Sequence, residues 1–213
     1  MRTLQFEPID IAGPVGPLDT LRLAPATALR GIALVAHPNP LQGGTHNNKI
    51  VHTLAKVLAR QGYVAYCPNL RGVGRSGGEH DHGQGEVDDM AAVLDYAVAS
   101  HGPLPLILAG FSFGTYVQTQ LAERLGHDQV ERLILIGPAC SRATLPAVPV
   151  ERTLVIHGEA DEVVPLASVL DWARPQDLPV VVAPGVGHFF HGKLTLLADW
   201  VNRLSPAPDS AQK

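Results

Sequence analysis

The sequence predicts a protein of the α/β class, with a mostly parallel central sheet covered by helices on both faces. Two observations carry this prediction. Short runs of consecutive apolar residues, as expected of strands buried on both faces, alternate with segments whose apolar residues recur every three or four positions, as in amphipathic helices. The chain has 213 residues, 46% of them hydrophobic and 17% charged, which is enough to bury both faces of one sheet.

The chain is expected to begin with an antiparallel pair. Residues 3–11 and 18–23 read as strands, and the turn region 13–17 between them contains two glycines and two prolines. The continuous apolar run 32–36 then predicts a strand buried on both faces. A helix follows it, with Thr45 as N-cap and an apolar stripe made by Ile50, Leu54, Val57 and Leu58.

Strand and helix alternate from there to the end. Residues 62–67 form the next strand, and the helix after it carries Val87, Met90, Ala91, Leu94 and Val98. The apolar run that ends at Gly110 leads into a helix with Val117, Leu121 and Leu125 on its buried face. The remaining elements are strands at 133–136, 154–156 and 180–183 and a last helix with Leu194, Leu197, Val201 and Leu204. Residues 1–204 are therefore expected to form one domain, and 205–213 a disordered C-terminal tail.

Composition excludes several classes of function. The net charge is −4 and no basic block occurs, which argues against a nucleic-acid or anionic membrane surface. No signal-peptide core and no apolar run of about 18 residues is present, so a cytoplasmic location is expected. In that compartment Cys67 and Cys140 are expected to be partly buried thiols, although one disulfide remains open. Neither cysteine has a Cys-x-x-Cys partner, so no structural zinc site is implied.

One pentapeptide, Gly110-Phe111-Ser112-Phe113-Gly114, has the pattern of a nucleophile elbow. In such an elbow a buried strand delivers a serine to a turn so tight that the residues two before and two after it need almost no side chain. The following helix then directs its N-terminal N–H groups at whatever binds the serine oxygen. The pentapeptide alone is only suggestive, but here a predicted strand precedes it and a predicted helix follows it. Phe111 and Phe113 are expected to form apolar walls beside the serine.

Polar residues follow four of the predicted strands, at the edge of a parallel sheet where ligands bind. They are His37-Pro38-Asn39-Pro40, Ser112, His157-Gly158-Glu159-Ala160-Asp161 and Gly185-Val186-Gly187-His188. In these motifs the chain resembles the α/β-hydrolases, which place serine, acid and histidine in this chain order. Among them it is most similar to the small, lidless, dienelactone-hydrolase-like serine hydrolases of bacteria.

The resemblance extends from about Arg30 to Leu204. Its motifs include Arg71-Gly72-Val73-Gly74-Arg75-Ser76, the pentapeptide around Ser112, the segment from Gly158 to Pro165, and Gly187-His188-Phe189-Phe190. Dienelactone hydrolases themselves have cysteine at the elbow, and this chain has serine. The resemblance implies an α/β-hydrolase fold without a cap domain, and only residues 137–153 separate the two strands between which lidded relatives insert one.

Each catalytic role has a preferred residue and a rival. Ser112 is the expected nucleophile, because the elbow presents its hydroxyl to a base. Asp161 is the expected acid, with Glu159 and Glu162 as rivals; the resemblance favours the acid four residues before Pro165. Each of these carboxylates could instead cap the helix that Pro165 begins.

The expected general base is His188, in a glycine-flanked loop. Its rival His191 is expected to lie already in the last helix, and His157 is interpreted as structural. The expected oxyanion-hole donors are the backbone N–H of Phe113 and Asn39, because Pro38 and Pro40 have no N–H to give.

Two further patterns are interpreted as decoys. Residues 72–77 match Gly-x-Gly-x-x-Gly, but the residues after them cannot open a helix, so no dinucleotide cofactor is expected. His80-Asp81-His82 could contribute metal ligands, but no third ligand is near in sequence, so a solvated loop is favoured and no metal is expected.

The resulting functional hypothesis is hydrolysis of a carboxylic ester or similar acyl bond in a small-molecule substrate, through an acyl-enzyme. A thioesterase or peptidase using the same residues stays open, as does a non-catalytic α/β-hydrolase-like binding module. The mouth of the site should be shallow unless a second copy in a homodimer covers it.

Overall fold

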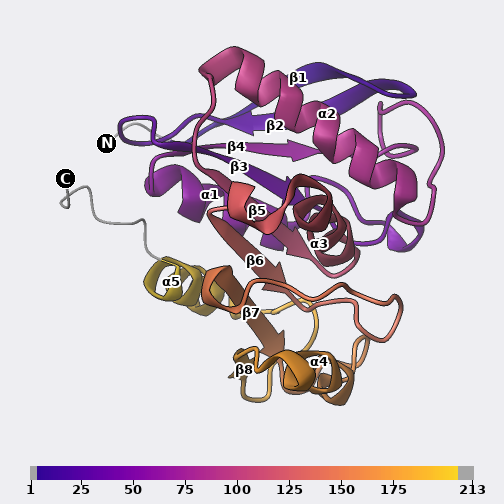
Figure 1. Ribbon diagram of the computed structural model, residues 1–213, viewed down its shortest axis with the longest axis vertical. Helices are drawn as coiled ribbons and strands as arrows, with labels where there is room; N and C mark the ends of the chain where they lie inside the picture. The colour runs from indigo at the N-terminus through magenta and orange to yellow at the C-terminus, as the bar shows by residue number, and fades with distance from the viewer. Residues whose placement is uncertain (1–3, 206–213) are drawn as a thin grey trace.

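Residues 4–205 are described by the computed structural model, and they form one eight-stranded sheet (Figure 1). The strand order is β1-β2-β4-β3-β5-β6-β7-β8. The first two pairings, β1 with β2 and β2 with β4, are antiparallel, and all others are parallel. The α/β class and the antiparallel start are therefore as predicted. The strands are β1 Phe6–Gly13, β2 Gly16–Leu23, β3 Gly31–Ala36, β4 Tyr63–Pro68, β5 Leu106–Phe111, β6 Arg132–Ile136, β7 Thr153–Gly158 and β8 Val180–Ala183.

Helices cover both faces of this sheet. In Figure 1 α2 and α3 lie in front of the strands, while α1 and α5 lie behind them. Each face carries its own apolar cluster: one packs against α2, α3 and α4, and the other against α1 and α5. The central strands β3, β4 and β5 are buried along their whole length, as their continuous apolar runs predict. The helices are α1 Lys49–Arg60, α2 Gln84–His101, α3 Phe113–Leu125, α4 Leu166–Ala173 and α5 Leu194–Leu204.

The N-cap of α1 differs from the prediction. Asn48, not Thr45, precedes the helix, and its Oδ1 accepts a hydrogen bond of 2.8 Å from the N–H of Ile50. Thr45 Oγ1 accepts instead from the N–H of Asn47, within the turn before the helix. Both side chains can cap a helix, and the sequence alone did not separate them.

The buried face of α2 is also rotated relative to the predicted stripe. Val98 is exposed, whereas Val93 and Ala97 are buried. The cause lies in the first turns of the helix, where two carboxylates, Glu86 and Asp89, are fully buried. An apolar pattern does not count them, so it misplaces the face that points inward.

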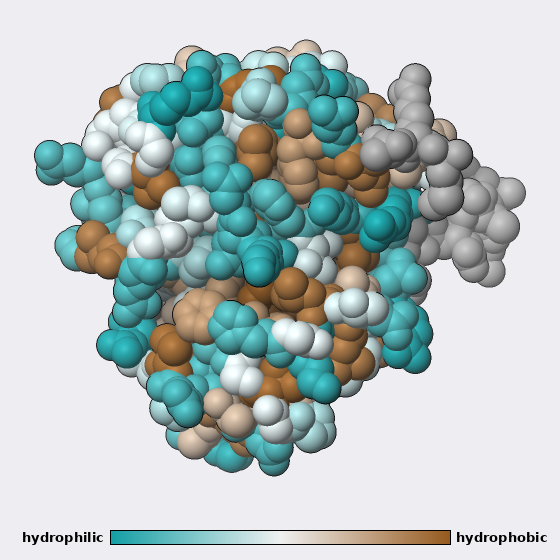
Figure 2. Space-filling model, turned by 180° about the vertical axis from the view of Figure 1, so that it is seen from behind, coloured by the Kyte–Doolittle hydropathy of each residue, from teal (hydrophilic) through white to brown (hydrophobic). Residues whose placement is uncertain are grey.

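The end of the described chain is partly buried. Ser205, which the sequence assigned to a tail, caps α5 and is almost fully buried, and Gln61 donates a hydrogen bond to its carbonyl oxygen. Residues 206–213 and the expected start of the first strand at Thr3 lie outside the described residues. On the face seen in Figure 2, hydrophobic side chains form groups interrupted by hydrophilic ones. No helix within residues 4–205 is long and apolar enough to cross a membrane.

Candidate active site

The turn after β5 holds Ser112 in an unusual backbone conformation. Its φ is 53° and its ψ is −119°, a combination that non-glycine residues rarely adopt. The turn has no room for larger residues on either side: a Cβ on Gly110 would collide with the carbonyl group of Gly114, and one on Gly114 with that of Ala36. The Ser112 N–H donates to the Ile136 carbonyl at 2.9 Å, which ties the elbow to β6. The pentapeptide thus forms the predicted strand-turn-helix.

Ser112, His188 and Asp161 form a row of hydrogen bonds at the carboxyl edge of the sheet. His188 Nδ1 lies 2.6 Å from Asp161 Oδ2, and His188 Nε2 lies 3.0 Å from Ser112 Oγ. Because a carboxylate can only accept, Nδ1 carries the proton and Nε2 is free to accept from the serine hydroxyl. All three side chains are buried although they come from loops far apart in sequence.

The carboxylate of Asp161 is fixed at both oxygens. Oδ1 accepts from the N–H groups of Val163 and Val164, at 2.8 and 2.7 Å, while Oδ2 faces His188. Burial acts to raise the pKa of Asp161, but the hydrogen bonds from His188, Val164 and Val163 outweigh it and lower the pKa overall. Asp161 is therefore held as an anion. The cap of α4 is Pro165, so none of the three acids has the helix-capping role considered above.

Neighbouring polar residues have other partners. Glu159 accepts from the N–H of Gly185 and joins the loops after β7 and β8. His157 donates from Nε2 to the Val164 carbonyl at 2.9 Å, is fully buried, and lies 3.5 Å from the Asp161 carboxylate. Burial lowers the pKa of His157, so it supports the acid loop as a neutral group.

The loop that carries His188 is anchored by an aromatic residue. Phe190 is fully buried in the apolar cluster beneath α1 and α5. Phe111 packs against the His188 ring with centroids 4.9 Å apart, but it is fully buried and does not line the pocket beside Ser112; of the two predicted walls, only Phe113 does. A Cβ on Gly137 would lie only 3.2 Å from the His188 ring, so glycine at this position makes room for the imidazole. The prediction for His191 was wrong in one respect: α5 begins at Leu194, and His191 precedes it in an exposed turn.

His37 fixes the loop after β3. The imidazole is fully buried, its Nε2 accepts from the N–H of Leu70 at 3.1 Å, and its Nδ1 donates to the Pro38 carbonyl at 2.7 Å. Burial lowers the pKa of His37 to about 4. The carbonyl of Pro38 and the N–H of Asn39 belong to one planar peptide group, in which they point in opposite directions. His37 thereby sets the direction of the Asn39 N–H.

Asn39 and Phe113 both border the pocket in front of Ser112. Within residues 4–205 no hydrogen bond is formed by the backbone N–H of either residue. The Asn39 side chain caps a short helical turn, η1 (Pro40–Gln42), by accepting from the N–H of Leu41. Both N–H groups therefore remain available to a ligand beside the serine.

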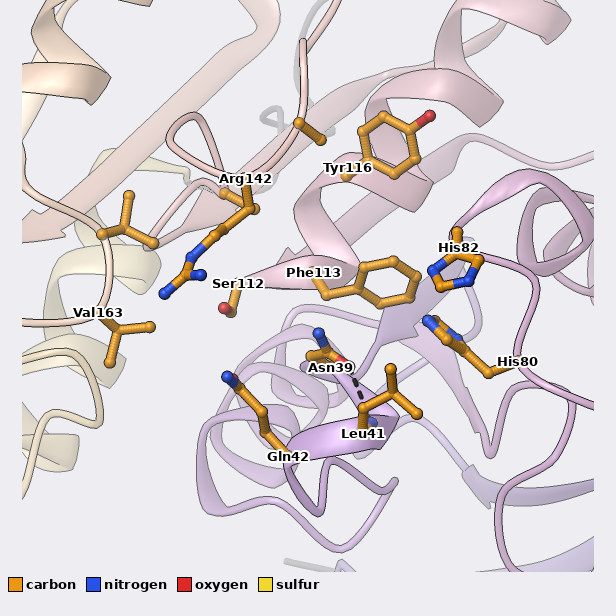
Figure 3. A pocket seen from close by; sticks show the side chains of 13 residues that line it. Asn39, Leu41, Gln42, His80, His82, Ser112, Phe113, Tyr116, Arg142 and Val163 are labelled. Carbon is orange, nitrogen blue, oxygen red and sulfur yellow. Dashed lines mark hydrogen bonds between the residues drawn. The ribbon is translucent and has the colours of Figure 1, made fainter.

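The pocket beside Ser112 has a volume of about 210 Å³ (Figure 3). Its walls come from the loop after β3, the loop before α2, the start of α3 and the loops after β6 and β7. Arg142, the one always-charged residue of the lining, was not predicted, because a lone arginine in a loop belongs to no sequence pattern. The lining consists of Asn39, Leu41, Gln42, His80, His82, Ser112, Phe113, Tyr116, Ala139, Arg142, Ala143, Val163 and Val164.

The loop before α2 is more ordered than a solvated loop. His80 borders the pocket with its side chain 11% exposed, and its Nδ1 lies 2.6 Å from the buried carboxylate of Glu86. Glu86 also accepts from the N–H groups of Asp81 and Gly83. Six residues separate Gly77 from the start of α2, so no helix begins directly after the Gly-x-Gly-x-x-Gly pattern. No cluster of three possible metal-ligating side chains occurs in the described part of the chain.

The strand order, the helices on both faces and the Gly-Phe-Ser-Phe-Gly turn after a central strand define the α/β-hydrolase class. The model of the family described as serine aminopeptidase S33 matches residues 41–152. A solved serine hydrolase without a lid from Xanthomonas campestris is 35% identical, covers 100% of this chain and 99% of its own, and superimposes with a TM-score of 0.88. The chain therefore belongs to the α/β-hydrolase family, and within it to the serine hydrolases.

Two curated relatives also match. An uncharacterised protein of Rickettsia prowazekii is 31% identical over 205 residues, which is 89% of this chain and 84% of the relative. A monoacylglycerol lipase of Mycolicibacterium smegmatis is 29% identical over 118 residues, which is 54% of this chain and 40% of the lipase. The lidless architecture inferred from the short segment after β6 agrees with the Xanthomonas structure.

Proposed function

We propose that the protein hydrolyses carboxylic esters of small molecules through an acyl-enzyme on Ser112. The observation that carries the proposal is the row of contacts at 3.0 Å from Ser112 Oγ to His188 Nε2 and 2.6 Å from His188 Nδ1 to Asp161. In this row Nε2 can accept the hydroxyl proton as the serine oxygen attacks a carbonyl carbon. The partial match to a monoacylglycerol lipase supports an ester substrate.

The proposed reaction has two halves, acylation of Ser112 and hydrolysis of the acyl-enzyme. His188 takes the proton of Ser112 as the C–O bond forms, and Asp161 stabilises the imidazolium. The N–H groups of Asn39 and Phe113 donate to the oxyanion of the tetrahedral intermediate. When the intermediate collapses, His188 gives its proton to the departing alkoxide, so the alcohol leaves. His188 then takes a proton from water, whose oxygen attacks the acyl-enzyme, and returns it to Ser112 as the acid is released.

The test compares the wild-type protein with Ser112→Ala. We expect the variant to lose both ester hydrolysis and labelling by a fluorophosphonate probe, while its circular dichroism spectrum stays unchanged. Ser100→Ala, on the exposed end of α2, is the matched control and should be labelled like the wild type. Persistent labelling of Ser112→Ala would contradict the assignment. A wild-type protein that is neither labelled nor active on a panel of esters, thioesters and peptides would instead indicate a binding module.

A further inference from the structure

We propose that the pocket beside Ser112 selects substrates that carry an anionic oxygen group, a carboxylate or a phosphate, and that Arg142 binds this group. The inference rests on the proposed hydrolase function and narrows its substrate class. It comes from the chemistry of the pocket lining, the freedom of the Arg142 side chain and the way its backbone is held.

The pocket is rich in hydrogen-bond donors and has no acidic side chain among its lining residues. This contrasts with the whole chain, in which acidic residues outnumber Lys and Arg, 20 to 16. Arg142 is the one always-charged side chain of the lining, and the imidazoles of His80 and His82 border the same space. Arg142 and His82 are exposed to solvent and His80 Nδ1 lies beside the Glu86 carboxylate, so a neutral acyl chain gains no charged contact here, whereas an anion would gain one with Arg142.

The guanidinium of Arg142 has no partner in the described part of the chain. No ion pair and no hydrogen bond of its side chain occurs within residues 4–205, whereas Arg71 pairs with Asp89 and Arg174 with Asp171. Figure 3 shows the Arg142 side chain extending over the pocket toward Ser112 and Val163 rather than away from it. Its planar fork of donors is therefore free to bind a carboxylate or phosphate in two-point contact.

The backbone of Arg142 is held against the elbow helix. The N–H groups of Arg142 and Ala143 both donate to the Ala139 carbonyl, at 2.9 and 3.1 Å, which closes a tight turn. The N–H of Ala139 in turn donates to Thr115 Oγ1, three residues after the serine, at 3.2 Å. The backbone of Arg142 is thus attached to the same helix that positions Ser112, so the base of the arginine side chain lies at a fixed place relative to the serine.

A second set of donors faces Arg142 across the pocket. Asn39 Oδ1 already accepts from the N–H of Leu41, so the side-chain NH₂ group of Asn39 is left to donate. Figure 3 shows the amides of Asn39 and Gln42 below Ser112 and the Arg142 guanidinium to the left of it, beside Val163. Since the pocket holds only about 210 Å³, the anionic group must lie within a few bonds of the scissile ester.

The experiment uses two matched pairs of esters. Phenyl hydrogen glutarate and phenyl pentanoate differ by a carboxylate on the acyl side, and 1-butanoylglycerol 3-phosphate and 1-butanoylglycerol differ by a phosphate on the alcohol side. In at least one pair we expect wild-type kcat/KM to be about tenfold or more higher for the anionic member, the usual size of a charge-assisted contact. Arg142→Gln should lower that ratio about tenfold, and Arg142→Lys less. Arg124→Gln, on the exposed end of α3, should leave the ratio unchanged.

The outcomes separate this inference from the proposed function. Hydrolysis of the neutral esters with no preference for either anionic member would overturn the inference while leaving the hydrolase assignment intact. A preference that persists in Arg142→Gln would overturn the role of Arg142. If no ester is hydrolysed, the proposed function fails. Equilibrium binding of the same pairs to Ser112→Ala, with and without Arg142→Gln, then still decides whether the pocket prefers the anionic member. The pair that responds shows which combination the pocket selects, a carboxylate on the acyl side or a phosphate on the alcohol side.

Discussion

Replacement of His37 by glutamine should make the free energy of unfolding fall less steeply as the pH is lowered from 7 to 4. In the folded protein the pKa of His37 is about 4, whereas an exposed histidine has a pKa of about 6.5. The unfolded chain therefore binds more protons between these values, so the contribution of His37 is complete above pH 6.5 and is lost as the pH falls toward 4. At about 1.4 kcal/mol per pH unit, this amounts to about 3 kcal/mol between pH 7 and pH 4.

Urea denaturation at pH 7 and pH 4 measures this quantity as a difference of free energies of unfolding. His37→Gln keeps a donor and an acceptor but cannot titrate, so it should lose about 3 kcal/mol less than the wild type over this interval. Ile32→Val, a buried change in β3, the strand that precedes His37, is the control and should lower the free energy of unfolding by about 1 kcal/mol at both pH values. Equal pH dependence in wild type and His37→Gln would refute the reasoning.

Two further predictions concern Asp161 and Gly114. Asp161→Asn should lower kcat about 10³- to 10⁴-fold. The amide oxygen would accept from the N–H groups of Val163 and Val164, so the NH₂ group would face His188 Nδ1 and the imidazole proton would move to Nε2, which could then no longer accept the proton of Ser112. The value of kcat at saturating ester measures this effect, and a loss below tenfold would contradict it. Gly114→Ala should lower the free energy of unfolding by about 2 kcal/mol or more, because the new Cβ would collide with the Ala36 carbonyl. Gly187→Ala is the control and should lower it much less, because its Cβ would have only an ordinary contact at 3.6 Å. Urea denaturation of both variants measures the difference, and equal stability would contradict the prediction.

The fold was predictable because its central strands are continuous apolar runs separated by turn residues and helical stripes. Those patterns depend on burial alone, so they place β3 to β8 within one or two residues. They fail where polar side chains are buried. Glu86 and Asp89 rotate the buried face of α2, and the cap of α1 depends on which of two side chains meets the first free N–H groups.

The positions of Ser112, Asp161 and His188 were predictable because each follows a strand and has a local motif. The places of Arg142 and His80 beside the pocket were not predictable, because neither residue follows a strand directly or belongs to a motif that indicates what it faces. Arg142 lies in a turn attached to Thr115 on another element, and a single sequence does not encode such a contact as a spacing. His80 lies beside Glu86, six residues later in the first turn of α2, where an apolar pattern does not predict a buried carboxylate.

Three loops of the site are each held by their own buried residues. His37 fixes the loop after β3, Gly110 and Gly114 hold the elbow after β5, and Phe190 holds the loop after β8. Because these residues already fix the loops, the Ser112 and His188 side chains, 76 residues apart in sequence, are in contact before substrate binds. Substrate binding therefore has to order little of the site. Truncation of Phe190 should therefore displace His188 more than the Asn39 peptide, and loss of the His37 side chain should do the reverse. For this reason we expect His37→Ala to lower kcat by up to the hundred- to thousandfold typical of one oxyanion donor, while labelling of Ser112 by a fluorophosphonate slows but persists.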